Sequence, residues 1–249
     1  MSVDTNSRAG RATRHAWEHF AEVDPYLYIL TEMKRSDPGL FWLSGRQVVE
    51  RELLPLLHRH GLQNHLALEL GCGLGRLVLP LSHYFDNVVG VDISTGMIER
   101  ATTLARDNGI SNVAFLPVSG PENLFRQASR YSGGCDLIYS LLVFQHIPDF
   151  AEIEGYLHVI GALLYQHGLA YLQFDTRPQT LLYHLKSNLP DFLLPRFSRR
   201  GIRRIRRSAQ DLESCFCRAG LEIVGEASPH TALHRYTLRV RPRARNGTK

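Results

Sequence analysis

The sequence has only four cysteines in 249 residues and lacks any long hydrophobic run. The cysteines form neither a C-x-x-C pair nor a zinc-ligand spacing, so they predict no disulfide framework and no bound metal. No segment approaches the roughly 18 uninterrupted apolar residues of a membrane span. Residues 1–14 also lack the apolar region of a signal peptide. We therefore expect a cytoplasmic protein without a membrane partner.

Extreme compositions are absent as well. With 44% apolar and 21% charged residues, the chain is unlike disordered, collagen-like or coiled-coil sequences and predicts a globular domain. Its charge is nevertheless uneven, because residues 175–207 hold nine Lys or Arg and two Asp. This segment carries +7 and the remainder −2. Such a basic segment is compatible with anion recognition and equally with a solvated surface.

From Leu66 onward, short apolar runs alternate with amphipathic stretches, which predicts an α/β doubly wound sheet with helices on both faces. The expected strands cover residues 66–70, 87–91, 112–117, 135–140, 169–174, 221–227 and 234–240. The last two are too close in sequence for a crossover helix and should form a hairpin. We predict seven strands, mostly parallel, with an antiparallel C-terminal edge strand. Its alternating arginines would deter sheet-to-sheet aggregation: Arg235, Arg239, Arg241, Arg243 and Arg245.

Helical periodicity also precedes and interrupts this alternation. Residues 11–60 have apolar residues at helical spacing and predict an N-terminal helical cap. Residues 175–207 form an insertion at the carboxyl edge of the sheet, where open α/β sheets bind ligands. The expected domains are a cap at 1–60 and a sheet domain at 61–249, with residues 175–207 as a lid.

The sequence predicts both ends of two helices in the sheet domain. Ser94 and Ser208 each precede a helical apolar stripe, and Gly109 and Gly220 follow these stripes. In the cap, residues 15–19 match the H-x-x-E-H pattern of metalloproteases. We interpret this match as part of a cap helix, because a more complete ligand motif lies elsewhere.

That motif is the glycine-rich segment 67–76, Ala-Leu-Glu-Leu-Gly-Cys-Gly-Leu-Gly-Arg. It predicts a strand, a tight turn and a helix start, with glycines where a ligand approaches the backbone. Arg76 stands where a dinucleotide motif needs a small residue, and the Lys-Ser/Thr ending of a triphosphate loop is missing. The ligand class that these two exclusions leave is a nucleotide-type cofactor without a phosphate group. Asp92, at the end of the next strand, can accept hydrogen bonds from both ribose hydroxyls.

Residues 66–146 resemble the class I S-adenosylmethionine-dependent methyltransferases of the small-molecule type. The resemblance implies that residues 61–249 bind S-adenosylmethionine. Where the family usually has an Asp after the third strand for the adenine amine, this chain has Leu116 to Gly120, and Ser119 or a backbone group would serve. The implied cofactor contacts are Glu69, Gly71 and Gly73 for the methionine part, Asp92 for the ribose, Ile93 and Met97 under the adenine, Ser119, and Leu141.

The segment 139–148 resembles the loop that lies beside the sulfonium in this family. His146 in this segment follows a strand end, so it is the candidate general base, with structural anchoring as the alternative. The cap and the insertion supply the expected substrate contacts, which are Tyr28, Trp42, Tyr183, His184 and Arg204.

Together these features predict a methyltransferase acting on a small-molecule acceptor, for which an anionic or carrier-bound compound would suit the arginines. Oxygen is the favoured acceptor atom, because the chain lacks the Asn-Pro-Pro-Tyr tetrapeptide that resembles amino methyltransferases of adenine or glutamine. One alternative is methylation of RNA or another polyanion, motivated by the basic insertion and the pI near 9.2. A non-methylating protein of the same fold, either a cyclase or a scaffold, is a further alternative.

Overall fold

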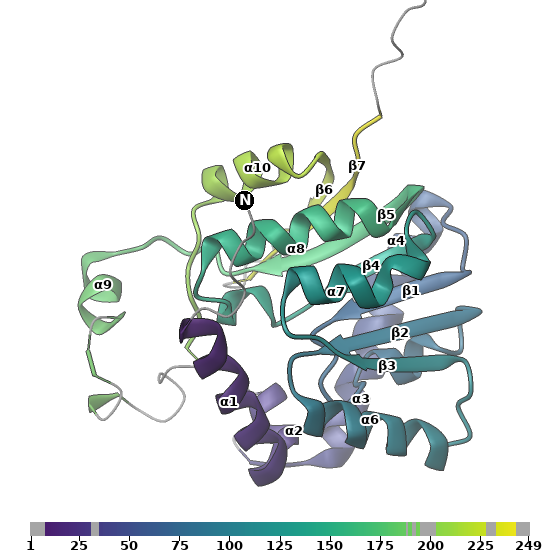
Figure 1. Cartoon of the computed structure of the whole chain (residues 1–249), viewed down its shortest axis with the longest axis horizontal. Coiled ribbons are helices and arrows are strands. Elements are labelled where there is room, and N and C mark those ends of the chain that lie inside the picture. The colour runs from purple at the N-terminus through teal and green to yellow at the C-terminus, as the bar shows by residue number, and fades with distance from the viewer. Residues whose placement is uncertain are drawn as a thin grey trace, which may run out of the picture.

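The computed structural model describes residues 8–30, 35–187, 189–190, 193–194, 203–227 and 233–242. Within these ranges, seven strands form one sheet in the order β3-β2-β1-β4-β5-β7-β6 (Figure 1). The predicted α/β sheet is confirmed, and most strand bounds agree within one residue, although β5 begins five residues earlier than expected. The strands are β1 (Leu66–Leu70), β2 (Asn87–Asp92), β3 (Val113–Pro117), β4 (Cys135–Ser140), β5 (Leu164–Phe174), β6 (Leu221–Ala227) and β7 (His234–Val240).

The reversed strand is β7, and it does not lie at the edge of the sheet. It pairs antiparallel with β5 on one side and with β6 on the other, so β6 is the edge strand. The predicted direction is confirmed and the predicted edge position is wrong. The physical reason is burial: Tyr236 and Leu238 of β7 are fully buried in the core, which a strand between two neighbours permits.

The arginines of β7 consequently have partners instead of guarding an edge. Arg235 forms an ion pair with Glu52 at 2.8 Å, and Arg239 pairs with Glu222 of the neighbouring strand. Arg243 and Arg245 lie outside the described residues.

Helices cover both faces of the sheet. The α-helices are α1 (Arg8–Val23), α2 (Pro25–Ile29), α3 (Pro38–Val48), α4 (Leu54–His60), α5 (Val78–Leu81), α6 (Thr95–Asp107), α7 (Pro121–Ala128), α8 (Phe150–Leu163), α9 (Leu181–Ser187) and α10 (Ala209–Arg218). A π turn, η1 (Val49–Leu53), joins α3 to α4, and two 3-10 turns are η2 (Ser129–Tyr131) and η3 (Phe144–His146).

Two apolar clusters sit on opposite faces of the sheet. One joins alternate strand residues such as Leu68 and Ile138 to α7, α8 and α10. The other joins Ala67 and Leu137 to η1, α4 and α5. Because successive strand residues point to opposite faces, the nearly continuous apolar strands bury both sides. The sheet is therefore the middle of three layers.

The two predicted helix starts are confirmed. The Ser94 hydroxyl accepts a hydrogen bond from the Met97 amide at 3.1 Å, and the Ser208 hydroxyl accepts one from Asp211 at 3.5 Å. Gly109 and Gly220 follow the two helices with positive φ angles of 68° and 73°, where a glycine carries no steric penalty.

The first helices occupy two different places. Helices α1 and α2 lie at the end of the sheet where the parallel strands finish, whereas η1 and α4 pack on its face. The division of the chain at residue 60 stays a prediction. In the part of the chain that the structure describes, no helix is both long and apolar enough to cross a membrane.

Candidate functional site

A pocket lies at the carboxyl ends of β1, β2 and β4, beneath α1. The empty space of this pocket, with its open mouth included, is about 1070 Å³. Its walls are formed by Gly10, Thr13, Trp17, Ile29, Glu69, Leu70, Gly71, Cys72, Gly73, Arg76, Val91, Asp92, Ile93, Met97, Val118, Leu141, Leu142, Val143, Phe144, His146, Ile147, Pro148, Glu152 and Tyr156.

The glycine loop forms a close-fitting floor. Gly71 and Gly73 have φ angles of 74° and 52°, which residues with a side chain rarely adopt. A Cβ atom on Gly71 would lie 2.3 Å from the Cγ2 atom of Val143, and one on Gly73 would lie 2.7 Å from the Cδ1 atom of Ile29. The loop therefore presents bare backbone to the pocket, with neighbouring side chains packed against it.

Asp92 connects the glycine loop to the start of α6. One carboxylate oxygen accepts from the Gly73 amide at 2.8 Å and the other from the Ser94 amide at 2.9 Å. Burial raises the pKa of Asp92, and these backbone hydrogen bonds partly oppose the rise. A carboxylate has about four acceptor positions, so both oxygens can still accept from a ligand hydroxyl.

Glu69 brings a second buried carboxyl group to the pocket. Its Oε2 atom has no hydrogen-bonding partner among the described residues. Burial raises the pKa of Glu69 to about 8, although the charge of nearby Arg76 lowers it. A buried acceptor without a partner is costly, so this oxygen is suited to a cationic or hydrogen-bonding ligand group.

Helix α1 is fixed over the pocket by Glu18. Its carboxylate accepts from the Ser94 hydroxyl at 2.8 Å and from the amides of Thr95 and Gly96 at 2.7 and 3.1 Å. A carboxylate at the N-terminus of α6 also interacts favourably with the helix dipole. The glutamate of the H-x-x-E-H match is thus a helix cap, and Gly10, Thr13 and Trp17 of the same helix line the pocket.

Replacing Glu18 by Ala is expected to loosen α1 and to raise the dissociation constant of the pocket's ligand by about three- to tenfold. The variant loses a set of charge-assisted hydrogen bonds, and because the carboxylate is only partly buried, the effect is limited to about 1 kcal/mol. Calorimetry with S-adenosylhomocysteine measures the change. The matched control is Glu22→Ala, an exposed glutamate one turn later on α1. Equal affinities for the two variants would show that Glu18 does not hold the helix.

The loop after β4 forms the wall beside the glycine floor. Leu142 adopts a φ of 66°, an unfavourable conformation for a residue with a side chain. The side chain of the next residue, Val143, packs against Gly71. The loop then enters η3, where His146 lines the pocket and packs edge-on against the Trp17 ring at a centroid distance of 5.8 Å.

His146 is held neutral. Burial lowers its pKa to about 4, the charge of Arg204 acts in the same direction, and the backbone of Arg203 opposes them. Its Nε2 atom lies 3.2 Å from the side-chain amide nitrogen of Gln145. Its Nδ1 atom has no hydrogen-bonding partner in the described part of the chain. His146 therefore brings an uncharged imidazole ring to the pocket wall.

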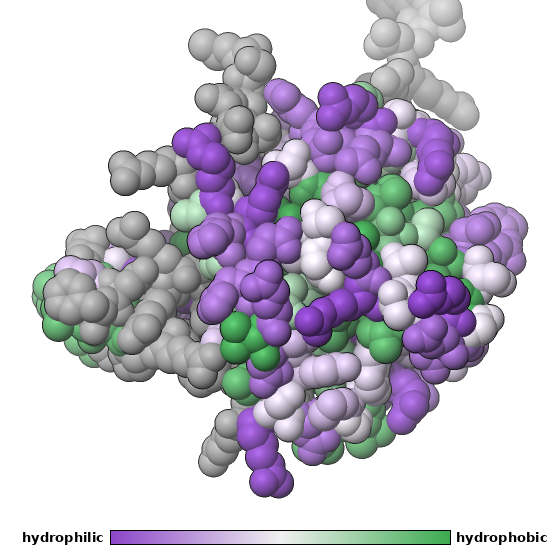
Figure 2. Space-filling view, turned by 60° about the horizontal axis from the view of Figure 1, so that its bottom comes forward, coloured by the Kyte–Doolittle hydropathy of each residue, from purple (hydrophilic) through white to green (hydrophobic). Residues whose placement is uncertain are grey.

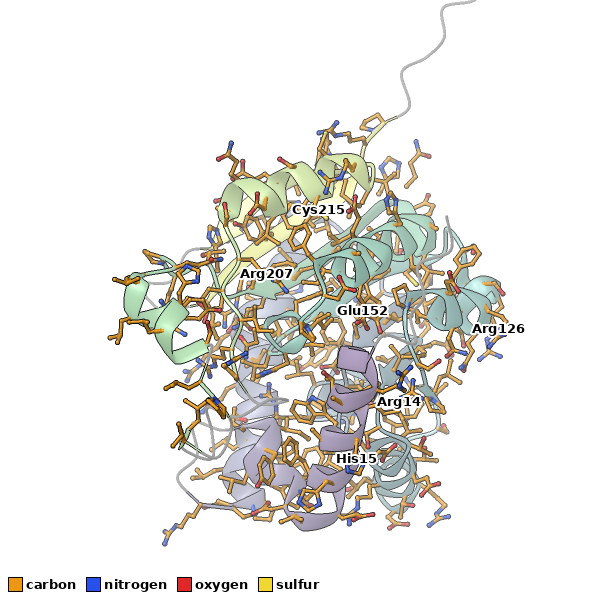
Figure 3. The ribbon with its side chains drawn as sticks, turned by 60° about the vertical axis from the view of Figure 1, so that its left-hand side comes forward. Arg14, His15, Arg126, Glu152, Arg207 and Cys215 are labelled. Carbon is orange, nitrogen blue, oxygen red and sulfur yellow. The ribbon has the colours of Figure 1, made fainter. Side chains whose placement is uncertain are left out.

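The end of the insertion braces this loop from outside. The Ile205 amide donates to the Gln145 carbonyl at 2.7 Å. The Arg207 guanidinium donates to the carbonyls of Ile147 and Pro148 at 2.9 and 2.8 Å, on the side of the molecule that faces α9 in Figure 3. Arg207 thus contacts backbone groups of the pocket loop and holds that loop in place.

Most of the predicted cofactor residues meet in the pocket. Ser119 does not line it: its amide donates to Asn123 at 3.1 Å, and the preceding Val118 faces the pocket instead. The predicted residues that do line it are Glu69, Gly71, Gly73, Asp92, Ile93, Met97, Leu141 and His146.

None of the five predicted substrate contacts lines the pocket. Tyr28 stacks on the Phe20 ring with centroids 4.0 Å apart, and Trp42 packs edge-on against Phe41. Their own aromatic neighbours hold these two rings in the cap core. Tyr183 and His184 lie on α9, away from the pocket. Arg204 reaches the pocket only through its charge on His146.

Trp17, Glu152 and Tyr156 are among the lining residues that had no assigned role at the sequence level. Trp17 belongs to α1, and Glu152 and Tyr156 belong to α8. Burial raises the pKa of Glu152, whereas Arg14 of α1 lowers it; both residues are labelled in Figure 3. The i, i+4 spacing of Glu152 and Tyr156 places them on one helix face, which is the signal that could have paired them.

Residues 67–168 match a family model described as a methyltransferase domain. A tRNA/tmRNA (uracil-C(5))-methyltransferase of Sulfurovum sp. strain NBC37-1 is 41% identical over 71 residues, covering 26% of this chain and 19% of that protein. A ribosomal protein L11 methyltransferase of Hamiltonella defensa is 30% identical over 128 residues, covering 51% and 42%. The chain thus spans less than half the length of these relatives.

Solved structures share the whole fold. The magnesium protoporphyrin IX methyltransferase of Synechocystis PCC 6803 with bound SAH has a TM-score of 0.62 at 16% identity, covering 92% of this chain and 99% of that one. An S-adenosylmethionine-dependent methyltransferase of Clostridium acetobutylicum has a TM-score of 0.61 at 15% identity, covering 91% and 100%. These likenesses establish a Rossmann-like methyltransferase fold.

Proposed function

We propose, since the chain belongs to the class I S-adenosylmethionine-dependent methyltransferases, that it methylates a small-molecule acceptor, preferentially at oxygen. The observation that carries this proposal is the pocket itself. One wall holds the glycine floor with Glu69 and Asp92, and the adjoining wall, formed by the loop after β4, carries the neutral His146. Residues of the first wall would hold the cofactor, and an acceptor would bind beside the second wall.

The first wall suits S-adenosylmethionine in charge and shape. The unpartnered Oε2 atom of Glu69 can accept from the α-ammonium group, and Asp92 retains acceptor positions for the ribose hydroxyls. Gly71 and Gly73 let the side chains of Val143 and Ile29 pack directly on the loop backbone, where a Cβ atom would clash with them. The apolar residues that can enclose the adenine are Ile93, Met97, Val118 and Leu141.

The bound cofactor supplies an electrophilic methyl group on a sulfonium. The chain's own contribution is to orient the acceptor and to exclude water, an effect worth up to about 7–11 kcal/mol in favourable cases. Trp17 of α1 and the loop braced by Arg207 close the sides of the pocket. His146 is uncharged near neutral pH and can take the proton that an alcohol or phenol oxygen loses when it is methylated.

The basic insertion supports a small acceptor better than RNA. Arg203 donates to the Ser187 carbonyl, Arg206 to the Pro178 carbonyl, and Arg207 to the pocket loop. Hydrogen-bond donors that are engaged within the protein in this way are not available for the direct phosphate contacts of an RNA-binding surface, although the arginines keep their positive charge. The RNA methyltransferase in the comparison also matches only 26% of this chain.

The test is methyl transfer from radiolabelled S-adenosylmethionine to two separate preparations, a small-molecule extract and total RNA from the same cells. We expect label in the small-molecule fraction, resistant to ribonuclease, and lost when S-adenosylhomocysteine is added in excess. Label in RNA alone would replace the proposal with the polyanion alternative. Cofactor binding without any labelled product would favour a scaffold.

Cofactor binding is expected to release a proton from Glu69. The free carboxyl has a pKa of about 8, and it must ionise to pair with an ammonium group, so the affinity should rise with pH. Calorimetry between about pH 6 and 7.5, where the ligand's α-amino group stays charged, measures both the affinity and the proton release. Glu69→Gln should bind more weakly and without pH dependence. A wild-type affinity that is flat with pH would contradict this assignment.

A further inference from the structure

Helix α9 carries apolar side chains that nothing in the described structure covers. We name five residues of α9 and the segment after it the leucine patch; their exposed fractions are Leu181 77%, Leu182 60%, Leu185 59%, Leu189 42% and Leu193 58%. Figure 1 shows α9 projecting from the body of the molecule, and Figure 2 shows hydrophobic atoms at the outer tip of this projection. Exposed apolar clusters on a projecting element are typical of interaction surfaces.

The same insertion is strongly basic. Residues 175–207 carry +7, and Asp175 neutralises only Arg177, by a direct ion pair. Arg203, Arg206 and Arg207 donate to backbone carbonyls, which are uncharged, so these arginines keep their positive charge. Arg203 contacts the end of α9 at Ser187 and Arg206 lies over the Tyr183 ring, so positive charge lies beside the leucine patch.

We propose that the leucine patch docks this protein on an anionic lipid surface. Exposed leucines on α9, with arginines of the same insertion beside them, match the apolar and basic character of segments that lie in the membrane interface. Each basic residue near an anionic surface adds attraction, and each buried methylene adds hydrophobic binding. The patch projects outward and so suits a broad lipid surface, whereas a helix-binding protein groove would need a longer helix. Surface docking requires no membrane-spanning helix.

A continuous chain of contacts connects the leucine patch to the pocket. The Tyr183 hydroxyl of α9 accepts from the Arg206 amide at 3.0 Å, and the Arg206 guanidinium lies 4.6 Å from the centre of the Tyr183 ring. The neighbouring Ile205 bonds to Gln145 in the pocket loop. Docking through α9 would therefore hold the insertion side of the pocket next to the lipid surface.

Vesicle flotation tests the docking without any methyl-transfer assay, so its result is independent of the proposed function. The probes are vesicles of phosphatidylcholine and of phosphatidylcholine mixed with phosphatidylglycerol. The test variant is L181S/L182S/L185S. The matched control is L40S/L43S, because Leu40 and Leu43 are also exposed, at 55% and 41%, and lie on α3, far from α9 in Figure 1.

We expect the wild type to bind the mixed vesicles better than the neutral ones, and more weakly as salt rises. The α9 variant should lower the partition coefficient by at least about tenfold, the equivalent of fewer than two buried methylene groups, while the α3 control stays unchanged. Unaltered melting temperature and S-adenosylhomocysteine affinity will show that the variants are folded.

Three results would overturn the proposal. The first is no binding of the wild type to mixed vesicles, and the second is equal binding by the wild type and the α9 variant. The third is complete competition by polyglutamate, a soluble polyanion without apolar surface, which would show recognition of charge alone and favour an acidic protein partner. A further charge control is Arg126→Gln, on the opposite side of the molecule from α9 in Figure 3.

Discussion

Replacing His146 by Ala is expected to lower the rate of methyl transfer by about 10²- to 10⁴-fold, the range of a lost general base. S-adenosylhomocysteine affinity should change little, because the proposed polar cofactor contacts, Glu69 and Asp92, belong to β1 and β2 and not to η3. Single-turnover measurement with saturating cofactor isolates the chemical step. The pH profile adds a second readout: the wild-type rate should fall as pH drops through about 4 and be flat near neutrality.

Measuring the stability of the protein as a function of pH tests the alternative that His146 only anchors the loop. The pKa of His146 is lowered on folding from its ordinary value near 6.5, so the unfolded chain takes up a proton first and the wild type loses stability as pH falls from about 6.5 toward 4. The His146→Ala variant should lack this pH-dependent loss of stability. If the variant loses stability and cofactor affinity together but keeps its rate at matched folding, then His146 is an anchor of the loop and not a base.

Asp92→Ala is expected to weaken S-adenosylhomocysteine binding by about ten- to hundredfold, which corresponds to charge-assisted hydrogen bonds worth roughly 1.5–3 kcal/mol. Part of this loss comes from the chain itself, because the Gly73 and Ser94 amides lose their acceptor. Isothermal calorimetry measures the affinity, and a thermal melt without ligand measures the part that is due to the loop.

Asp92→Asn separates the two contributions, because it keeps one oxygen acceptor at the same position. We expect its affinity to lie between those of the wild type and Asp92→Ala. Asp107→Ala is the matched surface control, since that carboxylate is exposed and makes only a 3.4 Å ion pair with Arg106. An Asp92→Ala variant that binds S-adenosylhomocysteine as tightly as the wild type would remove the ribose role from Asp92.

The cofactor wall was predictable because its determinants are local in the sequence. A glycine loop follows β1 directly and an acid ends β2, and parallel neighbouring strands bring these two ends together. The rest of the pocket wall depends on tertiary packing. Trp17 and Glu152 are more than a hundred residues apart, and only the docking of α1 by Glu18 over the sheet edge brings both to one pocket.

The substrate contacts expected in the cap and insertion show that an aromatic or charged residue type alone does not predict which side chains face the pocket. Tyr28 and Trp42 are aromatic and near the site in sequence, but stacking in the cap core satisfies them. The position of β7 was missed for a similar reason. Two strands joined by a short connection must be antiparallel neighbours, but their spacing cannot show which of the two also pairs with β5.

The placement of β7 between β5 and β6 also has a consequence for synthesis on the ribosome. β6 emerges first, but its hydrogen-bonding neighbour in the sheet is β7, which follows it in the chain. Until β7 has been translated, β5 presents an unpaired edge and Phe174 lacks the Tyr236 ring that packs against it. Such exposed edges and apolar surface attract chaperones and promote aggregation of nascent chains. Ribosome-bound chains in which β7 is still inside the exit tunnel should therefore remain protease-sensitive in β5, and chains with a C-terminal linker long enough to bring Val240 out of the tunnel should gain protection in a single step.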